Sequence, residues 1–108
     1  MTGALDGIVI ADFSRVLAGP YATMLLGDLG AEVIKVERAG VGDDTRGWGR
    51  PYDSTGMATY FGSVNRNKSS VFLNLADADD MAEAKALAHR AEVMIENFKP
   101  GALERMGL

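Results

Sequence analysis

Residues 7–38, GIVIADFSRVLAGPYATMLLGDLGAEVIKVER, predict a strand, a loop, a helix and a second strand in that order. The first strand is expected over Gly7–Phe13, where consecutive β-branched residues are typical of a strand buried on both faces. The helix is expected over Tyr21–Leu29 and the second strand over Ala31–Val36. Two short apolar strands joined by one helix predict a right-handed βαβ crossover, and therefore a parallel sheet.

The predicted helix has typical signals at both of its ends. Pro20 is compatible with a first helical turn, and Gly30 is a typical residue after the last turn. Ligands of parallel sheets bind at the carboxyl ends of the strands, which here are followed by Ser14–Pro20 and Glu37–Asp44. The apolar residues at helical spacing are Ala22, Leu25, Leu26 and Leu29.

The rest of the chain continues the same alternation after a long loop. Residues 39–68 are rich in Gly, Asp, Arg and Asn, and a loop of this length suggests a function. The fold class is therefore α/β, a Rossmann-like parallel sheet built of βαβ units with a final short helix. The further elements are expected at Met57–Val64 (a short helix or turn that presents Tyr60 and Phe61 to the core), Ser70–Leu75 (strand), Ala76–Ala91 (helix), Glu92–Phe98 (strand) and Ala102–Met106 (helix).

Length and composition limit the class of protein. A chain of 108 residues forms one domain at most, and its net charge of −4 argues against a nucleic-acid or anionic-membrane surface. There is no cysteine, no signal-peptide pattern and no apolar stretch long enough to span a bilayer, so we expect a soluble, cytoplasmic protein. Four short strands and three helices barely cover both faces of a sheet, so we expect residues 1–108 to be an incomplete part of a larger fold.

Several familiar kinds of site are disfavoured. His89 is the single histidine and lies near the end of a predicted helix, where a structural role is favoured over catalysis. One histidine without cysteine makes a zinc site improbable, and no G-x-S-x-G motif supports a serine triad. The glycine fingerprint of dinucleotide-binding folds is absent, and Glu37 alone resembles the acidic residue that binds a ribose. We therefore predict no metal.

Two polar clusters have a structural and a functional interpretation. Asp43, Asp44, Arg46 and Arg50 surround Trp48, either as a solvated loop with internal salt bridges or as a polar wall beside a ligand. The run 65–68, NRNK, is either a turn or an anion contact. The run 97–101, NFKPG, follows the last predicted strand, and its cation would suit a phosphate-bearing ligand.

Four ordered blocks resemble the start of the family III CoA-transferases. They are residues 12–38, DFSRVLAGPYATMLLGDLGAEVIKVER, then 42–52, GDDTRGWGRPY, then 65–75, NRNKSSVFLNL, and then 96–108, ENFKPGALERMGL. That family includes formyl-CoA and carnitine CoA-transferases and the α-methylacyl-CoA racemases. The second block is most similar to the branch of the succinate–hydroxymethylglutarate CoA-transferases.

The resemblance implies a CoA-binding surface on a Rossmann-like domain. Arg38 and Arg105 would neutralise or stack on the nucleotide end of CoA. Arg15 stands where some members have histidine, and Ala76 where they have lysine. The CoA-contacting positions implied by the resemblance are Leu17, Ala18, Arg38, Leu73, Asn74, Leu75, Ala76, Asn97, Phe98, Lys99 and Arg105.

The resemblance also implies a reaction and its location. In the transferases a catalytic aspartate forms an acyl anhydride with the donor and then a thioester with CoA. That aspartate lies downstream of the matched region, so no catalytic residue is assigned here. The expected partners are acyl-CoA and a carboxylic acid, here a dicarboxylic one, and the full enzyme is expected to be a homodimer. The alternatives are a racemase of the same family and a truncated CoA-binding module without catalysis.

Overall fold

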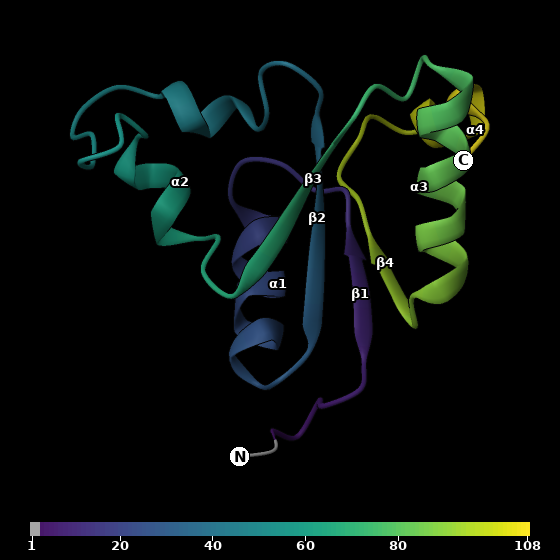
Figure 1. Cartoon of the computed structure of the whole chain (residues 1–108), viewed down its shortest axis with the longest axis horizontal. Helices are drawn as coiled ribbons and strands as arrows, with labels where there is room; N and C mark the ends of the chain where they lie inside the picture. Colours follow the sequence, from purple (N-terminus) through teal and green to yellow (C-terminus); the bar gives the residue numbers. More distant parts are fainter. Residues whose placement is uncertain (1–2) are drawn as a thin grey trace.

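The computed structural model describes residues 3–108 as four strands packed among helices (Figure 1). The elements, in chain order, are β1 (Val9–Asp12), α1 (Ala18–Asp28), β2 (Glu32–Arg38), a 3₁₀ turn η1 (Asp44–Gly47), α2 (Thr59–Ser63), β3 (Lys68–Leu73), α3 (Ala78–Arg90), β4 (Val93–Ile95) and α4 (Ala102–Met106). All of the predicted strands and helices are present.

The four strands form one parallel sheet in the order β3-β2-β1-β4. The chain moves outward from β1 to β2 and β3 and then returns to place β4 on the other side of β1. The direction of winding therefore reverses between β1 and β4, and ligands of open α/β sheets bind at such a reversal. This arrangement confirms the predicted α/β class.

The predicted boundaries differ from the observed ones at the strand ends and at the start of α1, which begins at Ala18, three residues before the predicted Tyr21. β2 continues to Arg38, two residues beyond the predicted end, because Glu37 and Arg38 pair with Phe72 and Leu73 of β3. β4 is only three residues long, since it pairs with β1 alone at the edge of the sheet. Pairing between distant strands sets these limits, and local sequence does not reveal it.

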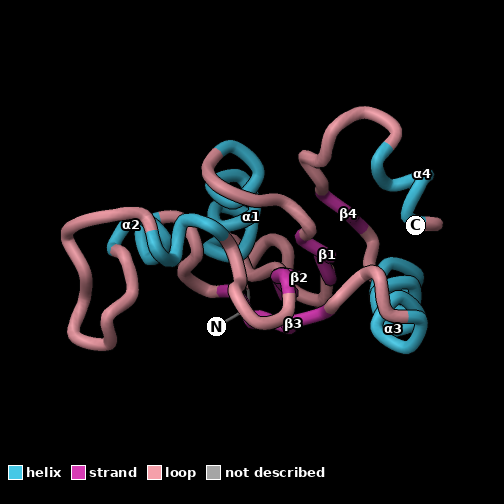
Figure 2. Tube along the Cα trace, turned by 90° about the horizontal axis from the view of Figure 1, so that it is seen from above, coloured by secondary structure: helices cyan, strands magenta, loops and turns pink. Residues whose placement is uncertain are grey.

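Helices α1 and α3 lie on opposite faces of the sheet (Figure 2). Successive side chains of β1 pack on opposite faces of the sheet: Ile10 belongs to one apolar cluster and Ala11 to the other. On the α3 face, Met81 and Ala84 pack with Ala11 and Phe13. This alternation explains why β1 has to be apolar in consecutive positions.

Helix α1 turns a different face to the sheet from the one that its leucines predict. It buries Pro20, Thr23 and Met24. The Thr23 hydroxyl donates a 2.6 Å hydrogen bond to the buried Asp12 carboxylate, and this polar contact fixes the rotation of the helix. The predicted apolar stripe is therefore not the buried face. Ala22, Leu25 and Leu29 are exposed, and Leu26 is half-buried.

The long loop between β2 and β3 is folded and carries η1 and α2 (Figure 1). Phe61 of α2 is buried as predicted, whereas Tyr60 is only partly buried and meets Trp48 edge to face at 5.6 Å between ring centroids. Trp48 itself is half exposed.

None of the helices formed by residues 3–108 has the length and apolar character that a bilayer crossing requires.

Candidate functional site

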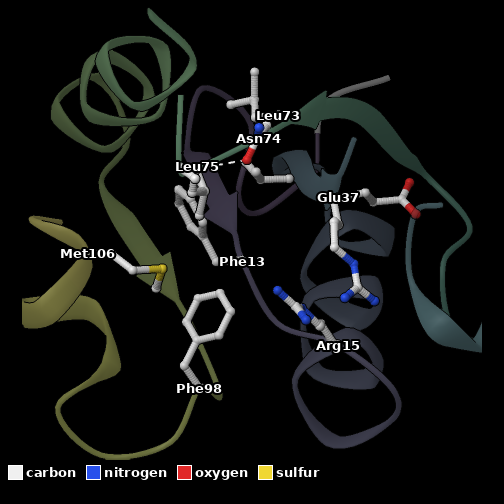
Figure 3. A pocket seen from close by; sticks show the side chains of 11 residues that line it. Phe13, Arg15, Glu37, Leu73, Asn74, Leu75, Phe98 and Met106 are labelled. Carbon is white, nitrogen blue, oxygen red and sulfur yellow. Dashed lines mark hydrogen bonds between the residues drawn. The ribbon is translucent and has the colours of Figure 1, made fainter. Parts of the chain in front are cut away.

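The carboxyl ends of all four strands meet at the upper edge of the sheet in Figure 1, and a cavity of about 190 Å³ opens there. Its wall is formed by the last residues of β2 and β3, by the segments that follow β1, β3 and β4, and by one residue of α4. Figure 3 shows aromatic and thioether side chains on one side and charged side chains on the other. The lining residues are Phe13, Arg15, Val36, Glu37, Arg38, Leu73, Asn74, Leu75, Ala76, Phe98 and Met106.

Six of the eleven positions that the resemblance implied lie around this cavity. They come from the ends of three different strands, and they are Arg38, Leu73, Asn74, Leu75, Ala76 and Phe98. Asn74 accepts a 3.1 Å hydrogen bond from the Ala76 N–H, so its amide shapes the turn that follows β3. The other five positions, which do not line this cavity, are Leu17, Ala18, Asn97, Lys99 and Arg105.

These five positions lie in three different places. Leu17 and Ala18 are exposed where α1 begins. Lys99 lines a separate hollow beside α4. Arg105 is on α4 and its guanidinium lies over Gly101. Asn97 binds the backbone of Arg15 through both atoms of its amide.

The resemblance did not imply five of the lining residues: Phe13, Arg15, Val36, Glu37 and Met106. Four of them could have been found from topology, since Phe13 and Arg15 follow β1, and Val36 and Glu37 lie near the end of β2. Met106 reaches the cavity only because α4 folds back beside the sheet, which no local pattern shows.

Arg15 and Phe98 form the wall of the cavity at the winding reversal, between the ends of β1 and β4. The Arg15 guanidinium lies over the Phe98 ring, 5.0 Å from its centroid. A cation in this position is attracted by the face of the ring. The contact leaves Arg15 with a defined position beside the cavity.

Glu37 lines the cavity, yet its carboxylate is fully engaged by the protein. Arg46 donates two hydrogen bonds of 2.7 Å to its two oxygens, and the Asp43 N–H donates another of 2.8 Å. Burial raises the pKa of Glu37, but these hydrogen bonds and the Arg46 charge outweigh it, so the pKa stays below its ordinary value. Glu37 therefore holds the long loop, and its similarity to a ribose-binding residue has no support in this geometry.

A buried ionic network lies beneath the loop that follows β1. Lys35 and Asp43 form one ion pair at 3.0 Å, and Lys68 and Asp12 form another at 3.1 Å. All four side chains are at most 1% exposed. Burial lowers the pKa of Lys68, an effect that the charge of Asp12 and its hydrogen bond partly offset.

The two polar clusters noted in the sequence, one around Trp48 and the other the NRNK run 65–68, both have a structural role. Asp43 caps η1 by accepting a 2.9 Å hydrogen bond from the Thr45 N–H, and Arg46 stacks on the Phe61 ring at 4.0 Å. In the NRNK run, Arg66 pairs with Asp28 of α1, where its hydrogen bond lowers the pKa of that carboxyl. Neither cluster contributes a catalytic group to the cavity.

His89 is exposed in the last turn of α3 and is not one of the residues that line the cavity. Within residues 3–108, no group of three or more histidine, cysteine, aspartate or glutamate side chains is arranged to hold a metal ion. The arrangement around the cavity is suited to binding, through apolar walls and guanidinium groups.

Comparison with known proteins places this architecture in a defined group. The chain is 58% identical over 104 residues to a succinyl-CoA:glutarate CoA-transferase of Mus musculus, a match that covers 96% of this chain and 24% of that protein. It is 46% identical over 105 residues to an acetyl-CoA:oxalate CoA-transferase of Acetobacter aceti, covering 97% of this chain and 26% of that protein. This chain therefore spans about a quarter of the length of these relatives.

A solved structure agrees with these similarities. The crystal structure of a CAIB/BAIF family protein from Brucella suis matches with a TM-score of 0.95 and 42% identity, covering all of this chain and 29% of that one. The sequence model described as CoA-transferase family III matches residues 5–108. The sequence, the fold and the relatives agree: this chain belongs to CoA-transferase family III.

Proposed function

We propose that this chain is the CoA-binding, amino-terminal part of an enzyme that moves CoA between an acyl-CoA thioester and a carboxylic acid. The observation that carries the proposal is the cavity at the winding reversal, which combines apolar walls with the guanidinium groups of Arg15 and Arg38. Such a site suits a ligand that joins an aromatic ring to phosphate groups, as the nucleotide end of CoA does.

The size of the cavity indicates which part of CoA it accepts. At about 190 Å³ it is smaller than the pockets of about 300–1,000 Å³ that enclose a drug-sized ligand. It therefore takes the adenine end, between Phe98, Leu75 and Met106, while phosphates lie toward Arg38. The rest of CoA extends along the exposed start of α1, at Leu17 and Ala18.

The relatives support transfer rather than racemisation, and a dicarboxylic acid as the acceptor. Proteins at 58% and 46% identity are named as CoA-transferases that use glutarate and oxalate. The nucleophilic aspartate of the family is predicted downstream, so none of residues 3–108 is assigned that role. By itself, this chain is expected to bind CoA without catalysing transfer. A homodimer, which the resemblance implies, and a cytoplasmic location, which the composition suggested, remain predictions.

Calorimetric titration with CoA tests the proposal. Arg38→Met removes the guanidinium from the cavity and breaks only an exposed ion pair with Asp44, so the fold is expected to persist. We expect the Kd for CoA to rise about tenfold, because hydrogen bonds to charged groups are lost. Arg66→Met is the matched control: Arg66 precedes β3, away from the carboxyl ends of the strands, and its loss should leave the Kd unchanged.

Two results would contradict the proposal. One is the absence of heat at millimolar CoA, and the other is NAD displacing CoA from the site. The intact mass of the protein in its native cell separates the enzyme from a truncated binding module. A mass near four times the 11.5 kDa of this chain corresponds to the length of the relatives and supports the enzyme. A mass of 11.5 kDa supports the module.

A further inference from the structure

In the loop that follows β1, each of five consecutive backbone groups forms a hydrogen bond with a side chain. These groups are the N–H and C=O of Ser14, the N–H and C=O of Arg15, and the N–H of Val16. Most buried backbone groups in proteins pair with other backbone, in helices and sheets. This loop, which we call the 14–16 loop, instead depends on side chains: that of the neighbouring Asp12 and those of Lys35, Asp43 and Asn97, which are distant in sequence.

Asn97 holds the centre of the 14–16 loop. Its Oδ1 accepts a 3.0 Å hydrogen bond from the Arg15 N–H, and its Nδ2 donates one of 2.8 Å to the Arg15 carbonyl. The amide thus pairs with Arg15 as a neighbouring strand would, just beyond the end of β4. Asn97 is 82 positions away in sequence, so this contact joins the two sides of the winding reversal.

The buried ion pair of Lys35 and Asp43 holds both ends of the loop. Lys35 donates a 3.0 Å hydrogen bond to the Ser14 carbonyl, and Asp43 accepts one of 3.3 Å from the Val16 N–H. Asp12 accepts a 2.9 Å hydrogen bond from the Ser14 N–H. Carboxylates bound to fixed partners in this way are rigid acceptors.

Val16 explains why the loop needs so many partners. Its φ is +72°, in the left-handed region, which is a true outlier for a β-branched residue. Such a conformation persists only where surrounding contacts impose it, and it concentrates at functional sites. The strained residue directly follows Arg15, which lines the cavity and lies over Phe98.

We propose that Asn97 and Asp43 are positioning residues of the CoA site: they hold Val16 in its strained conformation and thereby fix Arg15 in the cavity wall. The inference rests on the proposed CoA site and changes the expected role of Asn97. Its side chain acts through the Arg15 backbone rather than through a contact of its own with CoA.

The test uses Asn97→Ala, Val16→Gly and the double variant, in the protein at its native length. Asn97 is exposed, so the fold is expected to survive its truncation, whereas replacing Asp43 would leave Lys35 buried without its partner. We call the hydrogen bonds by which Asn97 and Asp43 hold the loop the clamp. Glycine adopts positive φ without strain, so Val16→Gly removes the need for the clamp. Binding of CoA is measured by calorimetry, and exchange of the Arg15 and Val16 amide protons by NMR.

We expect Asn97→Ala to weaken CoA binding about tenfold and to accelerate exchange of both amides by a similar factor. The double variant should regain most of the lost affinity, because the loop then keeps its shape without Asn97. Unchanged exchange in Asn97→Ala would overturn the clamp. A double variant that binds no better than Asn97→Ala would also overturn it, since it would indicate a direct contact between Asn97 and CoA. If the unmodified protein fails to bind CoA, the proposed function fails, and amide exchange alone then decides the clamp.

Discussion

The Lys35 ammonium group lies 3.0 Å from the Asp43 carboxylate, and each side chain is only 1% exposed. Lys35 belongs to the middle of the sheet, and Asp43 caps η1 at the start of the long loop. This buried charge pair, together with the hydrogen bonds that Glu37 accepts from Arg46 and the Asp43 N–H, fixes where the loop leaves the sheet.

Lys35→Met is expected to lower the free energy of unfolding by about 3–5 kcal/mol, because it leaves the Asp43 carboxylate buried without its cation. Urea denaturation measures the change. Asp44→Asn is the control: it removes an ion pair with Arg38 in which both side chains are 51% exposed, and should cost less than about 1 kcal/mol. Equal effects of the two substitutions would show that burial of the pair has no energetic consequence.

Acid is expected to destabilise the protein through Glu37 and Asp43. Burial raises the pKa of each carboxyl, but hydrogen bonds from Arg46 to Glu37, and from Thr45 and Lys35 to Asp43, bring both below their ordinary values of 4.5 and 3.8. A lowered folded pKa gives stability that is complete above the ordinary value and is lost as the pH falls toward the folded value.

The urea midpoint should therefore be constant from about pH 7 to about pH 5 and fall below about pH 4. Glu37→Gln should make this acid-side decline shallower, since one titrating group is removed. A midpoint in the unmodified protein that stays level down to about pH 3 would contradict the assignment.

The order of elements and the parallel sheet could be predicted because they depend on local patterns. The apolar run of β1, the proline in the first turn of α1 and the acidic first turn of α3 each act over a few residues. The handedness of βαβ crossovers limits the side on which each connecting helix lies, but it does not predict that β4 pairs with β1 in the order β3-β2-β1-β4.

The buried polar residues could not be predicted in the same way. Lys35 and Lys68 look like surface residues in a sequence, yet both are buried because carboxylates from other elements meet them. The face that α1 buries depends on Thr23 and Asp12 for the same reason. In the site, Met106 and the role of Asn97 depend on how the chain folds back after β4.

Two glycine-to-alanine substitutions in helices should change stability in opposite directions. A Cβ at Gly19 of α1 would overlap the Cβ of Ser14, a buried side chain whose hydroxyl donates a hydrogen bond to Asp12, so Gly19→Ala should cost about 1–3 kcal/mol. A Cβ at Gly62 of α2 meets no atom within 4 Å, so Gly62→Ala should gain up to about 1 kcal/mol from helix propensity. Thermal unfolding of both variants measures the difference, and the same sign for both would contradict the close approach at Ser14.

Ala76→Lys is expected to strengthen CoA binding. Ala76 lines the cavity and its side chain is exposed, so a lysine there adds a cation beside Arg15 and Arg38 without displacing core atoms. The backbone N–H that binds Asn74 is kept, so the turn after β3 should persist. An exposed ionic contact is worth up to about 1 kcal/mol, which corresponds to an affinity gain of up to about fivefold.

Salt distinguishes this electrostatic gain from a change in packing. Exposed charges are screened within about 10 Å at 0.1 M salt and about 3 Å at 1 M, so the gain should disappear at high salt. Ala76→Met is the matched control, because it adds a similar length of side chain without charge, and its Kd for CoA should equal that of the unmodified chain at every salt concentration. A gain that persists at 1 M salt, or that Ala76→Met reproduces, would show that apolar contact rather than charge acts at this wall, and the phosphates of CoA would then have to lie elsewhere.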